Sequence, residues 1–216
     1  ENAASRNDRP ARNGAAATRG RRDNLRRMSD PGEVGVLSGA EREVLLSRIR
    51  DIPDWPEPGV VFKDITPLLL DHAAFASMVS ALAAAGRDQA GAVAVDTVVG
   101  IEARGFILAA PVAHVLGVGL VPIRKQGKLP YRTRSASYEL EYGQATIEVH
   151  EDAFATGDRV LIVDDVLATG GTVEAAAGPV SASGASLVAV SVLMEVGFLA
   201  GRNRLGGLDL RALLRV

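Results

Sequence analysis

Two adjacent carboxylates, Asp164 and Asp165, follow an apolar run at 159–163, and a turn with paired glycines comes next. Free backbone N–H groups at a helix start bind phosphate, and carboxylates suit the neighbouring hydroxyls of a ribose or a magnesium-bound ligand. A capped helix behind a solvated aspartate pair is the simpler alternative, but it leaves the second glycine unexplained. The stretch therefore predicts a site for a phosphorylated sugar. The residues of this turn are Ala168, Thr169, Gly170, Gly171 and Thr172.

Two further polar segments also come directly after apolar, strand-like runs. They consist of Glu102, Ala103 and Arg104, and of Arg124, Lys125 and Lys128. Ligands of parallel sheets bind beyond the carboxyl ends of the strands, and clustered cations suit a diphosphate. By composition alone, the basic segment is better explained as a solvated loop, and Arg104 is equally explained as half of a surface ion pair.

The elements that must position these residues alternate along the chain. Helices are expected from Ser38 to about residue 51, at 73–85, from the residue after Gly105 to about residue 116, and at 171–183. Strands are expected at 95–101, 119–123, 159–163 and 186–194, with a hairpin around Gly143 and a polar, lid-like stretch at 124–137. This alternation predicts an α/β fold with a parallel β-sheet flanked by helices.

The composition of the 216 residues sets outer limits on the function. The chain has no cysteine, which excludes disulfides, cysteine-ligated zinc and cysteine catalysis and fits a cytoplasmic protein. Eight arginines fall within residues 1–30, where large apolar residues are scarce. We therefore expect a disordered Arg-rich extension at 1–37 and one folded domain at 38–216. A nucleic-acid-binding arm is the alternative for the extension.

The glycine-containing stretch VLIVDDVLATGGT resembles the ribose-phosphate motif of type I phosphoribosyltransferases. The segments PDWPEPGVVFKDITPLL, GIEARGF, IRKQGKLP and SYELEYG resemble those of one branch, the adenine phosphoribosyltransferases. The resemblance covers residues 41–214 and implies that branch's fold, with a small hood and a mobile loop. It also implies the purine-salvage reaction, in which adenine and 5-phosphoribosyl 1-diphosphate (PRPP) give AMP and diphosphate.

The resemblance further implies roles for the residues above. Asp164 and Asp165 would contact the ribose hydroxyls, and residues 168–172 would hold the 5-phosphate. Residues 102–104 would form the diphosphate-binding loop, although many relatives carry Asp where this chain has Glu102. Arg124, Lys125 and Lys128 would begin the mobile loop that closes over the substrate.

The base-binding residues are implied in the same way. Phe62 would stack on adenine, flanked by Val61 and Lys63, whose backbone groups would read the edge of the base, and Val196 would cover the other face. Glu141 would act as the acid–base partner at the N7 side of adenine, with Tyr142 beside it in the same loop. By periodicity alone, Glu141 is equally explained as the solvent-facing side of a hairpin.

The expected cofactor is Mg²⁺, which would arrive with PRPP and be held by substrate oxygens and water without direct protein ligation. The expected partners are adenine, PRPP and a second copy of the chain in a homodimer, with no membrane and no nucleic acid. Two alternatives remain: a phosphoribosyltransferase for another base, and a PRPP-binding regulator without catalysis.

Overall fold

The computed structural model of the chain describes residues 37–139 and 144–216. The predicted Arg-rich extension lies almost entirely outside them and stays a prediction. The helices are α1 (Gly39–Ser47), α2 (Thr66–Leu70), α3 (His72–Ala83), α4 (Arg104–Leu116) and α5 (Gly171–Ala182). The short 3₁₀ helices are η1 (Ala84–Gly86), η2 (Gly197–Leu199) and η3 (Gly201–Leu205). The strands are β1 (Arg50–Pro53), β2 (Val61–Asp64), β3 (Thr97–Ile101), β4 (Gly119–Lys125), β5 (Thr133–Glu139), β6 (Gln144–His150), β7 (Arg159–Leu167), β8 (Ser186–Glu195) and β9 (Leu210–Arg215).

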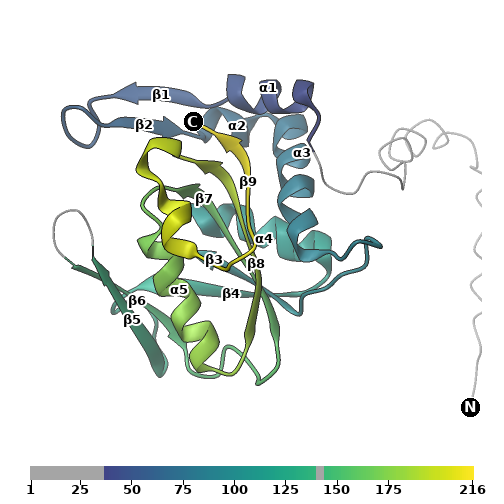
Figure 1. The fold of residues 1–216 in the computed structure, drawn as a ribbon, viewed down its shortest axis with the longest axis vertical. Coiled ribbons are helices and arrows are strands. Elements are labelled where there is room, and N and C mark those ends of the chain that lie inside the picture. The colour runs from purple at the N-terminus through teal and green to yellow at the C-terminus, as the bar shows by residue number, and fades with distance from the viewer. Residues whose placement is uncertain (1–36, 140–143) are drawn as a thin grey trace, which may run out of the picture. The chain divides into compact units, whose positions relative to one another are not determined.

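A seven-stranded sheet in the order β5-β6-β4-β3-β7-β8-β9 forms the centre of the domain. The neighbouring strands β4, β3, β7, β8 and β9 pair in parallel. Strand β6 pairs antiparallel with both β4 and β5. Helix α5 lies on the opposite side of the sheet from α3 and α4 (Figure 1). The predicted α/β class is therefore confirmed, and the separate β1–β2 hairpin corresponds to the expected small hood.

Alternation along β7 builds a core on each side of the sheet. Leu161 and Val163 join the cluster that contains α3 and α4, whereas Val160 and Ile162 join the cluster that contains α5. All four side chains are fully buried, as expected for a central strand covered on both faces. This central position makes β7 a rigid base for the polar residues at its carboxyl end.

Helix starts follow the signals in the sequence. Ser38 and Glu41 form the reciprocal hydrogen bonds of a capping box at α1. Asp71 caps α3 by accepting hydrogen bonds from the backbone of Ala73 and Ala74. Within the described part of the chain, no helix is long and apolar enough to span a membrane.

Four strands differ from the sequence expectations. The stretch expected as a polar loop at 124–137 contains the first part of β5, which pairs with β6 from Thr133 onward. This sheet-edge strand has polar residues on both faces, so it lacks an alternating apolar signal. The proline-rich region forms the β1–β2 pair, with Ile52 opposite Phe62. Strand β7 continues through Asp164 and Asp165 to Leu167, so the carboxylates lie within the strand and not after it.

Candidate active site

The predicted phosphate loop connects the end of β7 to the start of α5. Gly170 is the N-cap of α5 and has a φ of +84°, a left-handed conformation that favours glycine. Thr169 is exposed and Thr172 is partly buried. The first backbone N–H groups of a helix lack partners within the helix, and the dipole makes this end positive. The loop therefore has the geometry of an anion-binding helix start.

The two aspartates lie just before this loop and are almost fully buried. The Asp165 backbone N–H donates to Asp164 Oδ1 over 2.9 Å. Burial, reinforced by the negative charge of Asp165, raises the pKa of Asp164 well above its ordinary value. Burial also raises the pKa of Asp165, and the positive charge of Arg104 opposes that rise. Ionisation of this buried pair of carboxylates, near the carboxyl end of β7, is therefore unfavourable in the folded chain.

Arg104, at the start of α4, joins three of the predicted segments. Its Nη2 lies 2.8 Å from Asp165 Oδ2, and its Nη1 donates to the Lys63 carbonyl over 3.4 Å. Its guanidinium carbon lies 4.7 Å from the centre of the Phe62 ring, a cation–π distance. Among the described residues, none donates a hydrogen bond to Asp165 Oδ2, so this oxygen has an ion-pair partner but keeps its acceptor capacity.

Gly105 allows this close approach of α4 to β7. A Cβ on Gly105 would lie 2.8 Å from Asp164 Oδ1 and 3.2 Å from the Val163 carbonyl oxygen. A larger residue would therefore push the start of α4, and Arg104 with it, away from the aspartates. The peptide bond between Glu102 and Ala103, which leads into this turn, is cis.

The predicted base-binding segment lies on β2. The ring of Phe62 is 4.4 Å from that of Trp55 in an edge-on arrangement. Val61 is exposed, and Lys63 Nζ pairs with Asp51 over 2.7 Å. The Lys63 side chain is thus engaged on β1 while its carbonyl oxygen faces Arg104. This arrangement leaves backbone groups, not the ammonium, near the predicted base.

The two predicted diphosphate segments are tied together by Glu102. Its Oε2 accepts from the Lys125 backbone N–H over 2.9 Å and lies 3.3 Å from Arg124 Nε. The Lys125 N–H, together with the Arg124 guanidinium, lowers the pKa of Glu102. Arg124 also donates to the Lys128 carbonyl, and the side chains of Lys125 and Lys128 are exposed. Glu102 therefore organises the basic segment instead of facing outward itself.

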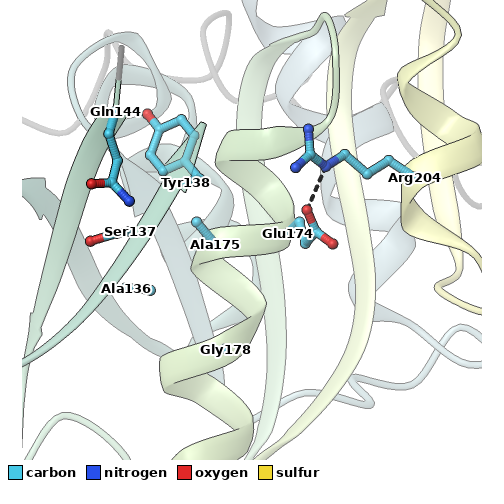
Figure 2. A pocket seen from close by; sticks show the side chains of 8 residues that line it. All are labelled: Ala136, Ser137, Tyr138, Gln144, Glu174, Ala175, Gly178 and Arg204. Carbon is cyan, nitrogen blue, oxygen red and sulfur yellow. Dashed lines mark hydrogen bonds and ion pairs between the residues drawn. The ribbon is translucent and has the colours of Figure 1, made fainter. Parts of the chain in front are cut away.

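Two predicted residues, Glu141 and Tyr142, lie outside the described residues. Tyr138 on β5 and Gln144 on β6 line a pocket of about 420 Å³ facing α5 (Figure 2). The pocket borders the side of α5, one to two turns along from the phosphate loop. Val196 is partly buried, and its backbone N–H donates to the Leu167 carbonyl, which places it next to the start of that loop.

The sequence analysis did not select the residues that contact the phosphate loop from behind, which belong to η3. Gly201 lies against Ala168 and Gly170, and Arg202 and Arg204 pair with Glu195 and Glu174. A short 3₁₀ segment has no periodic pattern of its own, so the sequence carried no signal for these contacts.

Comparisons with known proteins agree with this geometry. The phosphoribosyl transferase domain model matches residues 68–203. An adenine phosphoribosyltransferase of Nocardioides sp. is 62% identical over 88% of this chain and 100% of its own length. The chain belongs to the adenine phosphoribosyltransferase family. Crystal structures of adenine phosphoribosyltransferases from Rhodothermus marinus and Saccharomyces cerevisiae superpose with TM-scores of 0.78 and 0.77 at 46% and 35% identity. They cover 83% and 82% of this chain and all of their own.

Membership in the adenine phosphoribosyltransferase family establishes the reaction class. The chain is a pentosyltransferase of purine salvage that uses adenine as its base.

Proposed function

We propose that this adenine phosphoribosyltransferase binds PRPP across the carboxyl ends of β3, β4 and β7 and stacks adenine against β2. The observation that carries the proposal is Arg104, whose guanidinium contacts Asp165, Phe62 and the Lys63 carbonyl together. One side chain thereby links the segments assigned to ribose, base and diphosphate. In the yeast relative, a bisphosphate-bearing iminoaltritol and adenine are bound in one complex, which supports a shared site of this kind.

The 5-phosphate would bind to residues 168–172 at the start of α5, where the helix dipole and unpartnered N–H groups favour an anion. The ribose hydroxyls would donate to Asp164 and Asp165. Asp165 Oδ2 supports this role, since this buried oxygen forms an ion pair with Arg104 but accepts no hydrogen bond from the described residues. A ribose hydroxyl in that place would supply the missing hydrogen bond.

The diphosphate would bind between residues 102–104 and the basic segment. Positive charge there comes from Arg104, Arg124, Lys125 and Lys128. Glu102 connects the two segments by accepting a hydrogen bond from the Lys125 backbone N–H. Charge-assisted hydrogen bonds from preorganised cations stabilise the negative charge that grows on the leaving diphosphate.

Adenine would lie on the exposed part of Phe62, with Val196 against its other face. A backbone carbonyl accepts a hydrogen bond from a 6-amino group and repels a 6-oxo group, which favours adenine over hypoxanthine and guanine. The engagement of the Lys63 side chain with Asp51 supports reading by backbone groups, because the ammonium is held away from the base.

Glu141 would handle the proton of the adenine imidazole ring while N9 attacks the sugar C1. Departure of diphosphate leaves positive charge at C1, as in glycoside hydrolysis, and a carboxylate at the N7 side balances the change in protonation. Tyr142 would lie beside Glu141 in the same loop. Both residues lie outside the described part of the chain, so their support is the resemblance of SYELEYG alone.

Magnesium would enter with PRPP and neutralise part of its charge. Within residues 37–139 and 144–216, no three acidic or histidine side chains are grouped to hold a metal ion. The donors that fit an indirectly held magnesium ion are Asp164 and Asp165, through water and the ribose hydroxyls. We also propose a homodimer, because α4 and β4 expose Ile107, Val115 and Leu120, which a second copy would cover. We propose a cytoplasmic location, which the absence of cysteine from the sequence supports.

A panel of bases tests the proposal. The purified chain with PRPP and Mg²⁺ is expected to release diphosphate with adenine, but not with hypoxanthine, guanine, xanthine or orotate. Release with another base would refute backbone reading at residues 61–63. PRPP binding without release for any base would favour a regulator.

A further inference from the structure

The 3₁₀ helix η3 packs directly behind the phosphate loop. A Cβ on Gly201 would overlap the carbonyl oxygen of Ala168 and would lie 2.8 Å from the backbone N of Gly170 and 2.9 Å from the carbonyl carbon of Thr169. Such distances are shorter than real Cβ contacts, and each of these atoms belongs to the backbone of the loop. Gly201 is therefore in contact with the loop along three consecutive residues.

The contact is reciprocal. A Cβ on Gly170 would lie 2.6 Å from the carbonyl oxygen of Gly201. The two glycines thus allow two backbone segments, about thirty residues apart in sequence, to approach without any intervening side chain. Because backbone atoms are less able to move than side-chain ends, the position of η3 sets the position of the loop.

Arg202 holds η3 in this place. Its guanidinium pairs with Glu195 at the end of β8, with Nη2 2.8 Å from Oε2, and donates to the Leu210 carbonyl over 2.8 Å. Hydrogen bonds from Arg202 lower the pKa of Glu195, whose side chain is 7% exposed. Leu205 is buried in the core on the α5 side of the sheet. The segment is therefore fastened at both ends, by an ion pair and by an apolar contact.

A second ion pair connects η3 to α5. Arg204 pairs with Glu174, which lies in the first turn of α5 and borders the pocket in Figure 2. An unpaired carboxylate there would oppose an anion at the helix start. Arg204 therefore offsets a negative charge close to the proposed phosphate position.

We propose that Gly201 is a positioning residue for the 5-phosphate of PRPP and AMP, and that the Arg202–Glu195 ion pair keeps it there. This inference rests on the proposed role of residues 168–172. Gly201 contacts the loop backbone and not the substrate. It fixes the loop backbone, so that the N–H groups at the start of α5 converge on one point.

Gly201→Ala, compared with Gly206→Ala, tests the inference. Gly206 has a negative φ, and an added Cβ there meets none of the described atoms within 4 Å, so it is the matched control. We expect Gly201→Ala to raise the KM for PRPP and the Kd for AMP by about 10–100-fold, the scale of a displaced substrate contact. The KM for adenine, which carries no phosphate, should stay near wild type. An unchanged PRPP KM, or an equal rise for adenine, would overturn the inference.

Arg202→Lys and Arg202→Met give a second route if Gly201→Ala does not fold. Arg202→Met should weaken the binding of AMP more than the binding of adenine. Arg202→Lys keeps the charge but not the paired hydrogen bonds, so it should restore part of the lost AMP affinity. If Arg202→Met lowered the affinities for AMP and for adenine equally, the inference would be contradicted.

Thr169→Asp separates this inference from the proposed site, because a carboxylate on this exposed loop residue would repel an anion held at the start of α5. If Thr169→Asp leaves PRPP binding unchanged, residues 168–172 do not hold the phosphate and the proposed site is wrong. If Thr169→Asp weakens PRPP binding while Gly201→Ala does not, the site stands and only the role of Gly201 is wrong.

Discussion

The guanidinium of Arg104 stacks over the ring of Phe62 at 4.7 Å while one of its nitrogens pairs with Asp165. In the free chain, Arg104 thus covers both the ring expected to bind adenine and a carboxylate expected to bind ribose. A bound diphosphate would compete for the same cation. Substrate binding and the exposure of these two surfaces are therefore coupled through one side chain.

Replacement of Arg104 by lysine should weaken PRPP binding. Lysine keeps the charge but loses the planar fork that spans Asp165, Phe62 and the Lys63 carbonyl. We expect the KM for PRPP to rise about 10-fold or more, as for loss of a charge-assisted contact of roughly 1.5–3 kcal/mol. Steady-state kinetics with adenine saturating measure this. Arg159→Lys, at a surface ion pair with Asp96, is the control and should leave KM unchanged.

Adenine binding should change the fluorescence of Trp55. The chain contains one tryptophan, and its ring lies edge-on to Phe62 at 4.4 Å. A base stacked on Phe62 alters the surroundings of that indole, so titration with adenine in the presence of diphosphate should give a saturable signal. Trp55→Phe should abolish the signal and keep activity.

Phe62→Leu should raise the KM for adenine about 10-fold or more, because base stacking on an aromatic ring contributes roughly 1–3 kcal/mol. An unchanged KM for adenine would argue against stacking on Phe62.

Asp164→Asn should stabilise the free chain while lowering its activity. Burial raises the folded-state pKa of Asp164, so the stability it contributes is present below its ordinary pKa of 3.8 and is lost as pH rises through the folded value. Asparagine does not titrate and avoids this loss. Near neutral pH we expect a Tm higher by about 2–4 °C, the effect of roughly 1 kcal/mol in a domain of this size.

Calorimetry across pH provides the check on Asp164→Asn. The Tm difference from wild type should shrink as pH falls toward the ordinary pKa, and a difference independent of pH would contradict the explanation. Asp96→Asn is a control of opposite sign. Hydrogen bonds from Arg159 lower the pKa of Asp96 to about 2, so its contribution is present above 3.8 and is lost on acidification through about 2. Asp96→Asn should therefore lower the Tm near neutral pH.

Glu141→Gln should reduce kcat far more than it affects PRPP binding. Glutamine keeps the shape of the side chain but cannot exchange the proton of the adenine ring, and general acid–base groups contribute about 10²–10⁴-fold to rate. Pre-steady-state measurement of AMP formation separates this effect from product release. A kcat equal to wild type would remove Glu141 from the mechanism.

Deletion of residues 1–30 should leave kcat and both KM values unchanged. The segment is Arg-rich and poor in large apolar residues, and the match to the phosphoribosyl transferase domain model begins at residue 68. Kinetics and gel-shift assays with RNA and DNA, on both the full and shortened chain, distinguish the two expectations for the segment. A gel shift that depends on residues 1–30 would favour a nucleic-acid-binding arm.

The order of the elements was readable from the sequence because their signals are local. The strand, glycine turn and helix around residues 159–183 are contiguous, so one stretch of chain contains both the apolar run and the phosphate motif. The Asp71 and Ser38 caps were readable for the same reason. The first part of β5 was not, because this polar stretch of an edge strand is specified by its partner β6 and not by its own alternation.

The sequence by itself predicted a site for a phosphorylated ribose at the end of β7, since the residue types and spacing of that motif suit an anion and hydroxyl groups. Only the tertiary structure decided which distant residues complete the site. It brought Arg104 onto both Phe62 and Asp165, turned Glu102 toward Lys125, and set Gly201 against Gly170. These contacts join segments far apart in the chain, and their geometry depends on how the sheet, helices and η3 pack, which no local pattern encodes.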